Sequence, residues 1–375
     1  MKVFHCDACG QTVFFENFAC VKCGHRLAFL PDTGDMAALD PTDDGLWRVT
    51  TGGIPGPAYR LCENNEFENV CNWAVPATDP EPLCSSCRLN RTIPNLGVEG
   101  NRDLWGRVES AKRRAVYTLL CMRLPILPKA DDQDENDTGL AFDFLADPDP
   151  ADEDAKPVLT GHASGLITLN IAEADDTERE RRRTQLGEPY RTLLGHFRHE
   201  LAHYYWDRLI ANGPYLVEFR RLFGDEREDY GEALKKHYAN GAPPDWQNAF
   251  VSTYATSHAW EDWAESWAHY MHIVDTIEMA VECGLELKPW RHGEPTLKPT
   301  IPIIDGQPTS FQKTMANWFA LTYVLNNLNR CLGQPDGYPF VLSPPAVEKL
   351  RFIHEVIGNW PQTSKPEPNE SSSGG

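Results

Sequence analysis

The five residues His199-Glu-Leu-Ala-His203 have the spacing of a metal site with a base beside it. On a helix, residues four apart share a face, so the two histidines can direct their imidazoles toward one metal ion. Glu200 lies one step round the helix, where its carboxylate would reach a water activated by that metal and act as a general base. A catalytic zinc site has three protein ligands, and the two histidines supply only two of them. The pattern therefore predicts metal-dependent hydrolysis if a third ligand comes from elsewhere in the chain.

The third ligand is expected from a tryptophan-rich segment, residues 254–271. Its apolar side chains recur at helical spacing, at Trp260, Trp263, Trp267 and Met271. Glu261 and Glu265 lie four residues apart on a neighbouring stripe. A carboxylate beside an apolar face is costly unless it is paired or bound to a metal. We assign Glu261 as the third ligand and Glu265 as the carboxylate that hydrogen-bonds a ligating histidine and fixes its tautomer.

Alternatives to this assignment stay open at the level of sequence. Glu265 could be the ligand and Glu261 its supporting carboxylate, or Asp262 or His258 could be the ligand. Tyr254 precedes Glu261 by seven residues, and its phenol could donate to the oxyanion that forms when water attacks a carbonyl. A structural role for this tyrosine has equal weight.

Eight of the eleven cysteines fall in the first 87 residues. Cys6-x-x-Cys9-Gly and Cys20-x-x-Cys23-Gly are tight turns that each offer two thiolates to one ion. Strands are expected at residues 11–15 and 26–30. Two such turns on short strands predict a zinc ribbon, and the metal would supply much of the folding energy of so small a unit.

A second four-thiolate zinc site is expected within residues 45–97, from Cys62, Cys71, Cys84 and Cys87. The spacing of its first two cysteines is looser than that of a ribbon turn, so the alternative is a single C-x-x-C turn. The chain begins without the apolar stretch of a secretory signal. Unevenly placed cysteines in such a chain indicate metal ligands rather than disulfides, and a cytoplasmic location.

Several helices and one strand must position these groups. The long helix that carries the histidines is expected to begin around Pro189 and to end at Asn212-Gly213-Pro214. Residues 161–171 read as one strand, placed to hold a substrate by backbone pairing. His162 is expected to be structural, with a role near the cleft as the alternative. Other helices are expected at 101–124, 173–183, within 219–237, at 311–329 and at 345–357.

The charge distribution narrows the function. The formal net charge is −20, which argues against binding nucleic acid non-specifically. Residues 131–155 hold eleven acidic residues and no Lys or Arg, and we expect an acidic loop there. The chain has no apolar run long enough for a membrane span. Residues 361–375 are expected to form a disordered tail.

These residues resemble a bacterial family of zinc-binding metallopeptidases that join an N-terminal zinc-ribbon domain to an H-E-x-x-H domain. The resemblance runs from residue 1 to about residue 360 and is carried by the two ribbon turns, Cys62 to Cys87 with Arg88-Leu89, residues 160–167 and residues 188–200. The arrangement of Tyr254, Glu261 and Glu265 is also similar to gluzincin-like domains of the anthrax lethal factor type. The resemblance implies an α+β chain, in which small metal-stapled β modules precede a mainly helical zincin-like domain with a small sheet.

We therefore expect a tandem four-cysteine ribbon region at 1–97 and a peptidase-like domain at 98–360. The expected cofactors are one catalytic Zn²⁺ and up to two structural Zn²⁺. The leading function is a zinc metallopeptidase that acts on a peptide or protein, with the ribbons either structural or presenting the substrate or a partner protein. The alternative is a non-catalytic adaptor that binds a partner through its ribbons, in which the H-E-x-x-H site holds a structural metal.

Overall fold

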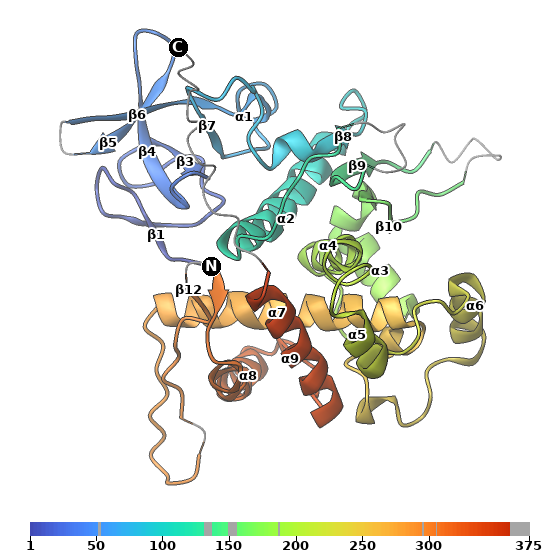
Figure 1. Cartoon of the computed structure of the whole chain (residues 1–375). Coiled ribbons are helices and arrows are strands. Elements are labelled where there is room, and N and C mark those ends of the chain that lie inside the picture. The colour runs from blue at the N-terminus through green and yellow to red at the C-terminus, as the bar shows by residue number, and fades with distance from the viewer. Residues whose placement is uncertain are drawn as a thin grey trace, which may run out of the picture.

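The computed structural model describes residues 1–51, 54–130, 137–148, 156–186, 188–294, 296–304 and 306–360. A β-rich N-terminal region packs beside a mainly helical region that contains a second, small sheet (Figure 1). The α+β fold class expected from the sequence is confirmed. The acidic loop at 131–155 lies partly outside the described residues, and the tail at 361–375 lies wholly outside them.

The N-terminal region is built on an antiparallel sheet in the order β3-β4-β5-β6-β7. Its strands are β3 (Arg26–Leu30), β4 (Asp35–Pro41), β5 (Trp47–Thr51), β6 (Ile54–Leu61) and β7 (Ala74–Pro76), preceded by the pair β1 (Phe4–His5) and β2 (Thr12–Val13). A short helix, α1 (Glu63–Glu66), follows β6. The strand expected at 26–30 is confirmed, whereas the one expected at 11–15 is reduced to two residues. The strands β4 to β6 stand between the two cysteine groups, in a stretch for which no strand was named from the sequence.

Helix α2 (Asn101–Cys121) joins this region to the rest of the molecule, and it confirms the helix expected there. Its Tyr117 ring contacts Phe4, Phe15 and Phe29, with ring centroids 5.5–6.3 Å apart. The largest hydrophobic core is consequently continuous from the N-terminal strands into the helical region. The boundary expected near residue 98 stays a prediction.

The second sheet has the strand order β10-β11-β9-β8. Its strands are β8 (Asn90–Thr92), β9 (Ala141–Leu145), β10 (Gly161–Ala163) and β11 (Leu166–Asn170). β8, β9 and β11 are parallel, and β10 pairs antiparallel to β11 at one edge.

This sheet corrects two expectations. Residues 161–171 are not one strand but a hairpin, because Ser164 and Gly165 adopt left-handed backbone angles (φ 47° and 82°) and turn the chain back. Part of the supposed acidic loop is strand β9. Its Phe142 and Phe144 are fully buried against Phe197 of α4 (Leu193–Leu209), the helix that carries the two histidines.

The helical region is arranged around α7 (Ala259–Glu282), the long helix that runs across the molecule in Figure 1, with α4 above it and α8 (Phe311–Cys331) below it. The other helices are α3 (Asp176–Leu186), α4 (Leu193–Leu209), α5 (Leu216–Phe223), α6 (Tyr230–Asn240), α8 (Phe311–Cys331) and α9 (Pro344–Gly358). Short 3-10 turns η1 (Cys87–Leu89), η2 (Ile171–Ala174), η3 (Trp246–Asn248) and η4 (Tyr254–Thr256) and the pair β12 (Ile303–Ile304) and β13 (Gln307–Pro308) complete the elements.

Helix α4 starts later than expected, at Leu193 rather than around Pro189. Thr192 has an extended backbone, and its side chain accepts a hydrogen bond from the Gly195 amide at 3.0 Å, which caps the helix. The residues before Thr192 are held by ion pairs instead, such as Arg191 with Glu173 at 2.7 Å.

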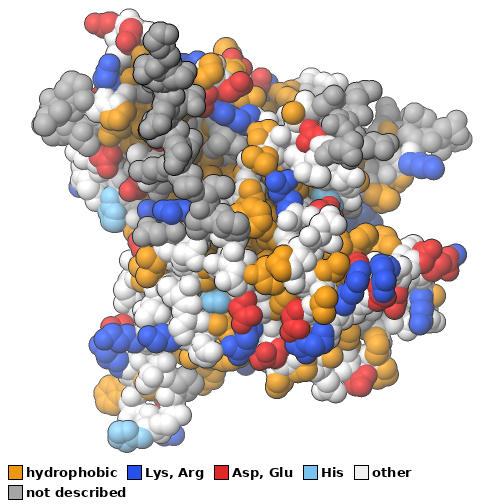
Figure 2. Space-filling view, in the orientation of Figure 1, with side chains coloured by type: hydrophobic (Ala, Val, Ile, Leu, Met, Phe, Trp, Pro, Cys, Tyr) orange, Lys and Arg blue, Asp and Glu red, His pale blue; other side chains and the backbone are white. Residues whose placement is uncertain are grey.

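Charged side chains of both signs are interspersed over the lower half of the face in Figure 2. In helix α3, oppositely charged side chains pair along the helix, Arg181 with Glu178 and Arg183 with Glu180, each at 2.6 Å. Within the part of the chain that the structure describes, no helix is both long and apolar enough to cross a membrane.

Candidate active site and metal centres

Helices α4 and α7 are held together at the level of the H-E-x-x-H sequence. The indole N–H of Trp263 donates to the carbonyl oxygen of Ala202 at 2.8 Å, one residue before His203. One turn further on, Trp267 stacks on Tyr205 with ring centroids 5.2 Å apart. Of the tryptophans on this face, Trp263 and Trp267 are fully buried, and Trp260 is partly buried against the core. These contacts fix the distance between the acidic side chains of α7 and the histidines of α4.

Three side chains converge as a potential metal site between these helices. The Nε2 atom of His199 lies 3.0 Å from Oε2 of Glu261, and Nε2 of His203 lies 3.7 Å from the same oxygen. One donor atom from each residue can be chosen so that all lie within 4.8 Å of one another. Glu261 is buried, yet among the described residues its Oε2 has no hydrogen-bond partner. A buried, unpaired oxygen facing two imidazole nitrogens fits a divalent metal ion of the zinc type.

Glu265 lies on the other side of the His199 ring. Its Oε1 is 2.8 Å from Nδ1 of His199, which is the contact expected of a carboxylate that orients a ligating imidazole. Burial alone would lower the pKa of His199, but Glu261 and Glu265 outweigh it and hold this pKa well above its usual range. The two carboxylates thus create a strongly negative field at His199, and a metal cation at its free nitrogen would satisfy that field.

Glu200 and Tyr254 both face a cavity of about 450 Å³ that opens beside the three converging side chains. Burial is the main cause that raises the pKa of the Glu200 carboxyl above its usual value. The Tyr254 ring lies next to His199, with centroids 5.9 Å apart. The cavity is lined by Thr160, Gly161, His162, Ala163, Ser164, His199, Glu200, His203, Trp206, Asp207, Tyr230, Tyr254, Trp260 and Glu261.

The two other ligand candidates make contacts elsewhere. His258 caps α7, since its Nδ1 accepts from the Trp260 amide at 3.1 Å and its Nε2 lies 3.1 Å from the carbonyl oxygen of Glu228. Asp262 pairs with the buried amine of Lys349 at 2.5 Å. Both residues are therefore engaged away from the converging donors.

Residues 160–164 form one wall of the cavity through β10, the edge strand. His162 lies closer to the site than a purely structural residue would need to, because its ring stacks on His203 with centroids 6.0 Å apart. Its Nε2 accepts a hydrogen bond from the Gly165 amide at 3.0 Å. Burial lowers the pKa of His162 to about 3, so the ring is neutral near pH 7.

Several cavity residues were not predicted from the sequence. Trp206 and Asp207 lie about one turn after His203 on α4, and helical spacing from the histidines could have found them. Tyr230 begins α6, and its hydroxyl donates to Oε1 of Glu261 at 2.6 Å. No local pattern connects Tyr230 with Glu261, because the contact arises only from the way the chain folds back.

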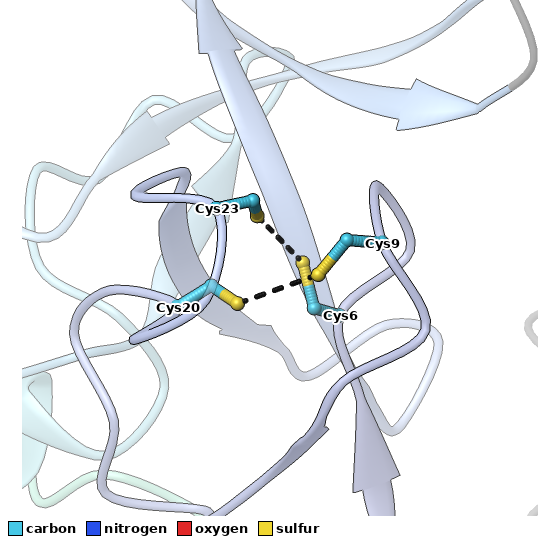
Figure 3. Close-up of side chains that lie close together, drawn as sticks. All are labelled: Cys6, Cys9, Cys20 and Cys23. Carbon is cyan, nitrogen blue, oxygen red and sulfur yellow. Dashed lines mark hydrogen bonds between the residues drawn. The ribbon is translucent and has the colours of Figure 1, made fainter.

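The first cysteine group, Cys6, Cys9, Cys20 and Cys23, converges from two turns (Figure 3). The sulfurs of Cys6 and Cys23, and those of Cys9 and Cys20, are 3.6 Å apart. Tetrahedral zinc with Zn–S bonds of about 2.3 Å places its sulfurs about 3.8 Å apart, so the four thiols fit a zinc ion. This group lies near the surface, with Cys23 exposed.

The second cysteine group, Cys62, Cys71, Cys84 and Cys87, is wholly buried. The sulfurs of Cys71 and Cys84 are 3.8 Å apart, as tetrahedral zinc requires. Helix α2 supplies the buried cations Lys112 and Arg113 beside it. Burial opposes the charge of Arg113, but the neighbouring thiols, Cys71 above all, raise its pKa. Four thiolates around one Zn²⁺ carry net negative charge, and Lys112 and Arg113, which also pair with the buried Glu109, offset part of it.

The comparisons with known proteins agree with this architecture. Residues 101–356 match the family described as "Putative zinc-binding metallo-peptidase", and residues 3–98 match a zinc-ribbon domain. The chain belongs to this zinc-binding metallopeptidase family and carries an N-terminal zinc ribbon.

Among its relatives are Uncharacterized protein Rv2568c of Mycobacterium tuberculosis (strain ATCC 25618 / H37Rv) and Uncharacterized protein Mb2598c of Mycobacterium bovis (strain ATCC BAA-935 / AF2122/97). Each is 43% identical to this chain over 358 residues, which cover 95% of this chain and 95% of the relative. No solved structure matches the chain significantly.

Proposed function

We propose that the protein is a zinc-dependent peptidase whose active site is the cavity beside α4 and α7. The observation that carries the proposal is that Glu200 lines the same cavity as His199, His203 and Glu261. These three residues would hold the zinc ion, with Glu265 orienting His199. A metal that only stabilises the fold needs neither an open cavity nor a free carboxylate beside it.

Zinc bound there would supply a Lewis acid that activates water and polarises the carbonyl of the scissile bond. Glu200 would take a proton from the attacking water and deliver it to the leaving amine. Its raised pKa suits both steps, because an acid–base group works best when its pKa is near the working pH. Tyr254 would donate its hydroxyl hydrogen to the oxyanion that develops on the substrate.

The edge strand β10 supports a peptide as the substrate class. Its residues 161–163 wall the cavity and pair with β11, and no other strand of the described residues pairs with them. An extended peptide could add to the other side by backbone hydrogen bonds, which would bring its scissile carbonyl beside the histidines. The family membership favours the same class of substrate.

The two cysteine groups would hold structural zinc ions, giving three zinc sites in all. The ribbons are proposed to stabilise the N-terminal region or to present the substrate or a partner protein. A cytoplasmic location stays a prediction from the sequence.

The test is to follow metal content and cleavage of a broad peptide library together. We expect three zinc ions per chain, of which a mild chelator removes one first. Cleavage should stop when this ion leaves and return after one equivalent of zinc is added. A protein that binds the third ion but cleaves no peptide would support the adaptor function instead.

A further inference from the structure

Tyr230 touches a ligand candidate that no other side chain of α6 reaches. Its hydroxyl donates to Oε1 of Glu261 at 2.6 Å, within the range of a strong hydrogen bond to a carboxylate. The other oxygen, Oε2, faces the two histidines and is the one without a hydrogen-bond partner in the described part of the chain. Each oxygen of Glu261 thus has a different neighbour.

The different neighbours of its two oxygens affect how Glu261 can bind a metal ion. A carboxylate with two free oxygens can chelate zinc through both and occupy an extra coordination position. A donor on Oε1 disfavours that arrangement, because binding the metal through Oε1 would compete with the hydrogen bond. Tyr230 therefore favours ligation through Oε2 alone, which leaves a position for water.

Tyr230 shares the cavity with the residue proposed to stabilise the oxyanion. Both tyrosines line it, and the Tyr254 ring lies beside His199. The Tyr230 hydroxyl donates to Glu261, so a change at Tyr230 acts first on this metal ligand.

The placement of Tyr230 is specific, since α6 contributes no buried residue to the core. The Tyr230 ring packs against His258 and Trp260, with centroids 5.3 and 6.0 Å apart, and these contacts hold it beside the buried carboxylate. The far end of α6 also lies near the site, since the His237 ring is 6.1 Å from that of Tyr254.

We propose that Tyr230 is a positioning residue of the zinc site: it restricts Glu261 to one-oxygen ligation. This proposal rests on the proposed zinc site but not on the identity of any peptide substrate.

The test is Tyr230→Phe in the full chain, with the affinity of the most readily removed zinc measured by chelator competition. We expect this affinity to fall about 10-fold to 100-fold, as is typical when an outer hydrogen bond to a ligand is lost. The two zinc ions of the cysteine groups should stay bound, which shows that the variant is folded. After the chelated site is reloaded with Co²⁺, the visible absorption should weaken because the coordination number rises.

Two further variants serve as controls. Tyr238→Phe removes a hydroxyl from an exposed tyrosine of the same helix and should leave zinc affinity unchanged. Tyr254→Phe should also leave this affinity near that of the wild type. Wild-type zinc affinity and an unchanged cobalt spectrum in Tyr230→Phe would overturn the proposal. If Tyr230→Phe loses zinc affinity as expected but the wild type cleaves no peptide, the positioning role stands and the peptidase function fails.

Discussion

The buried cysteine group and the histidine–glutamate group are both suited to zinc, but their surroundings differ. Cys62, Cys71, Cys84 and Cys87 offer four sulfurs, are closed off from solvent and have two buried cations beside them. His199, His203 and Glu261 offer three donor atoms beside an open cavity, and no Lys or Arg is among the residues that line it. A closed four-donor set can only hold the fold together, whereas a three-donor set with a nearby carboxylate can also perform chemistry.

The largest difference between the two sites should appear when a ligand is removed from each. Cys84→Ser should prevent recovery of a folded protein, because the buried group then loses its metal and with it several kcal/mol of folding energy. His203→Gln should fold with wild-type helical circular dichroism and lose a single zinc ion. Cys283→Ser, at an exposed thiol outside both groups, is the control and should behave as wild type. A wild-type melting temperature for Cys84→Ser would contradict the structural role of the buried cysteine group.

A smaller effect is expected from Tyr254→Phe, which acts only on the open site. Loss of one oxyanion donor should lower kcat about 10²-fold to 10³-fold, while the zinc content stays the same. Steady-state kinetics with a cleaved library peptide would measure the change, with Tyr238→Phe as the matched control. An unchanged kcat would leave Tyr254 with only a structural role.

The smallest effect concerns the pH dependence of stability in the helical region. Burial lowers the pKa of His269 to about 4, and its Nδ1 lies 2.6 Å from the Tyr338 hydroxyl. The unfolded chain binds a proton at this histidine near pH 6.5, whereas the folded chain does so only near pH 4. The stability that the neutral His269 contributes is therefore present above pH 6.5 and is lost as the pH falls toward 4.

His269→Gln should lower Tm at pH 7 but make Tm fall less steeply than in the wild type between pH 6.5 and pH 4. Thermal melts of both proteins across this range would measure the slopes, and any acid loss of zinc from the cysteines affects both equally. Parallel curves would show that His269 does not contribute to the acid sensitivity.

The two histidines and the close cysteine pairs could be found from the sequence because their spacing is local, whereas Glu261 was assigned from its place beside an apolar helical face. Two histidines four apart on a helix, or two cysteines around a tight turn, must lie on the same side of the chain. The contact of Glu265 with His199 was also expected, since Glu261 and Glu265 share a stripe on one helix.

The features that could not be predicted depend on contacts between distant segments. Tyr230 reaches Glu261 only because α6 folds back over the cavity. Strand β9 lies within an acidic stretch, and its burial comes from pairing with β8 and β11 on either side. The turn at Ser164 and Gly165 carried a local signal in its glycine, which the run of apolar residues after it obscured.

The most direct test of the central claim is the cleavage rate of Glu200→Gln against that of the wild type, with both proteins loaded with zinc. The substitution keeps the size of the side chain and removes the base. We predict that the rate falls about 10²-fold to 10⁴-fold, that three zinc ions remain bound, and that Glu180→Gln on the exposed face of α3 cleaves normally. A Glu200→Gln protein that cleaves peptides as fast as the wild type would contradict the account.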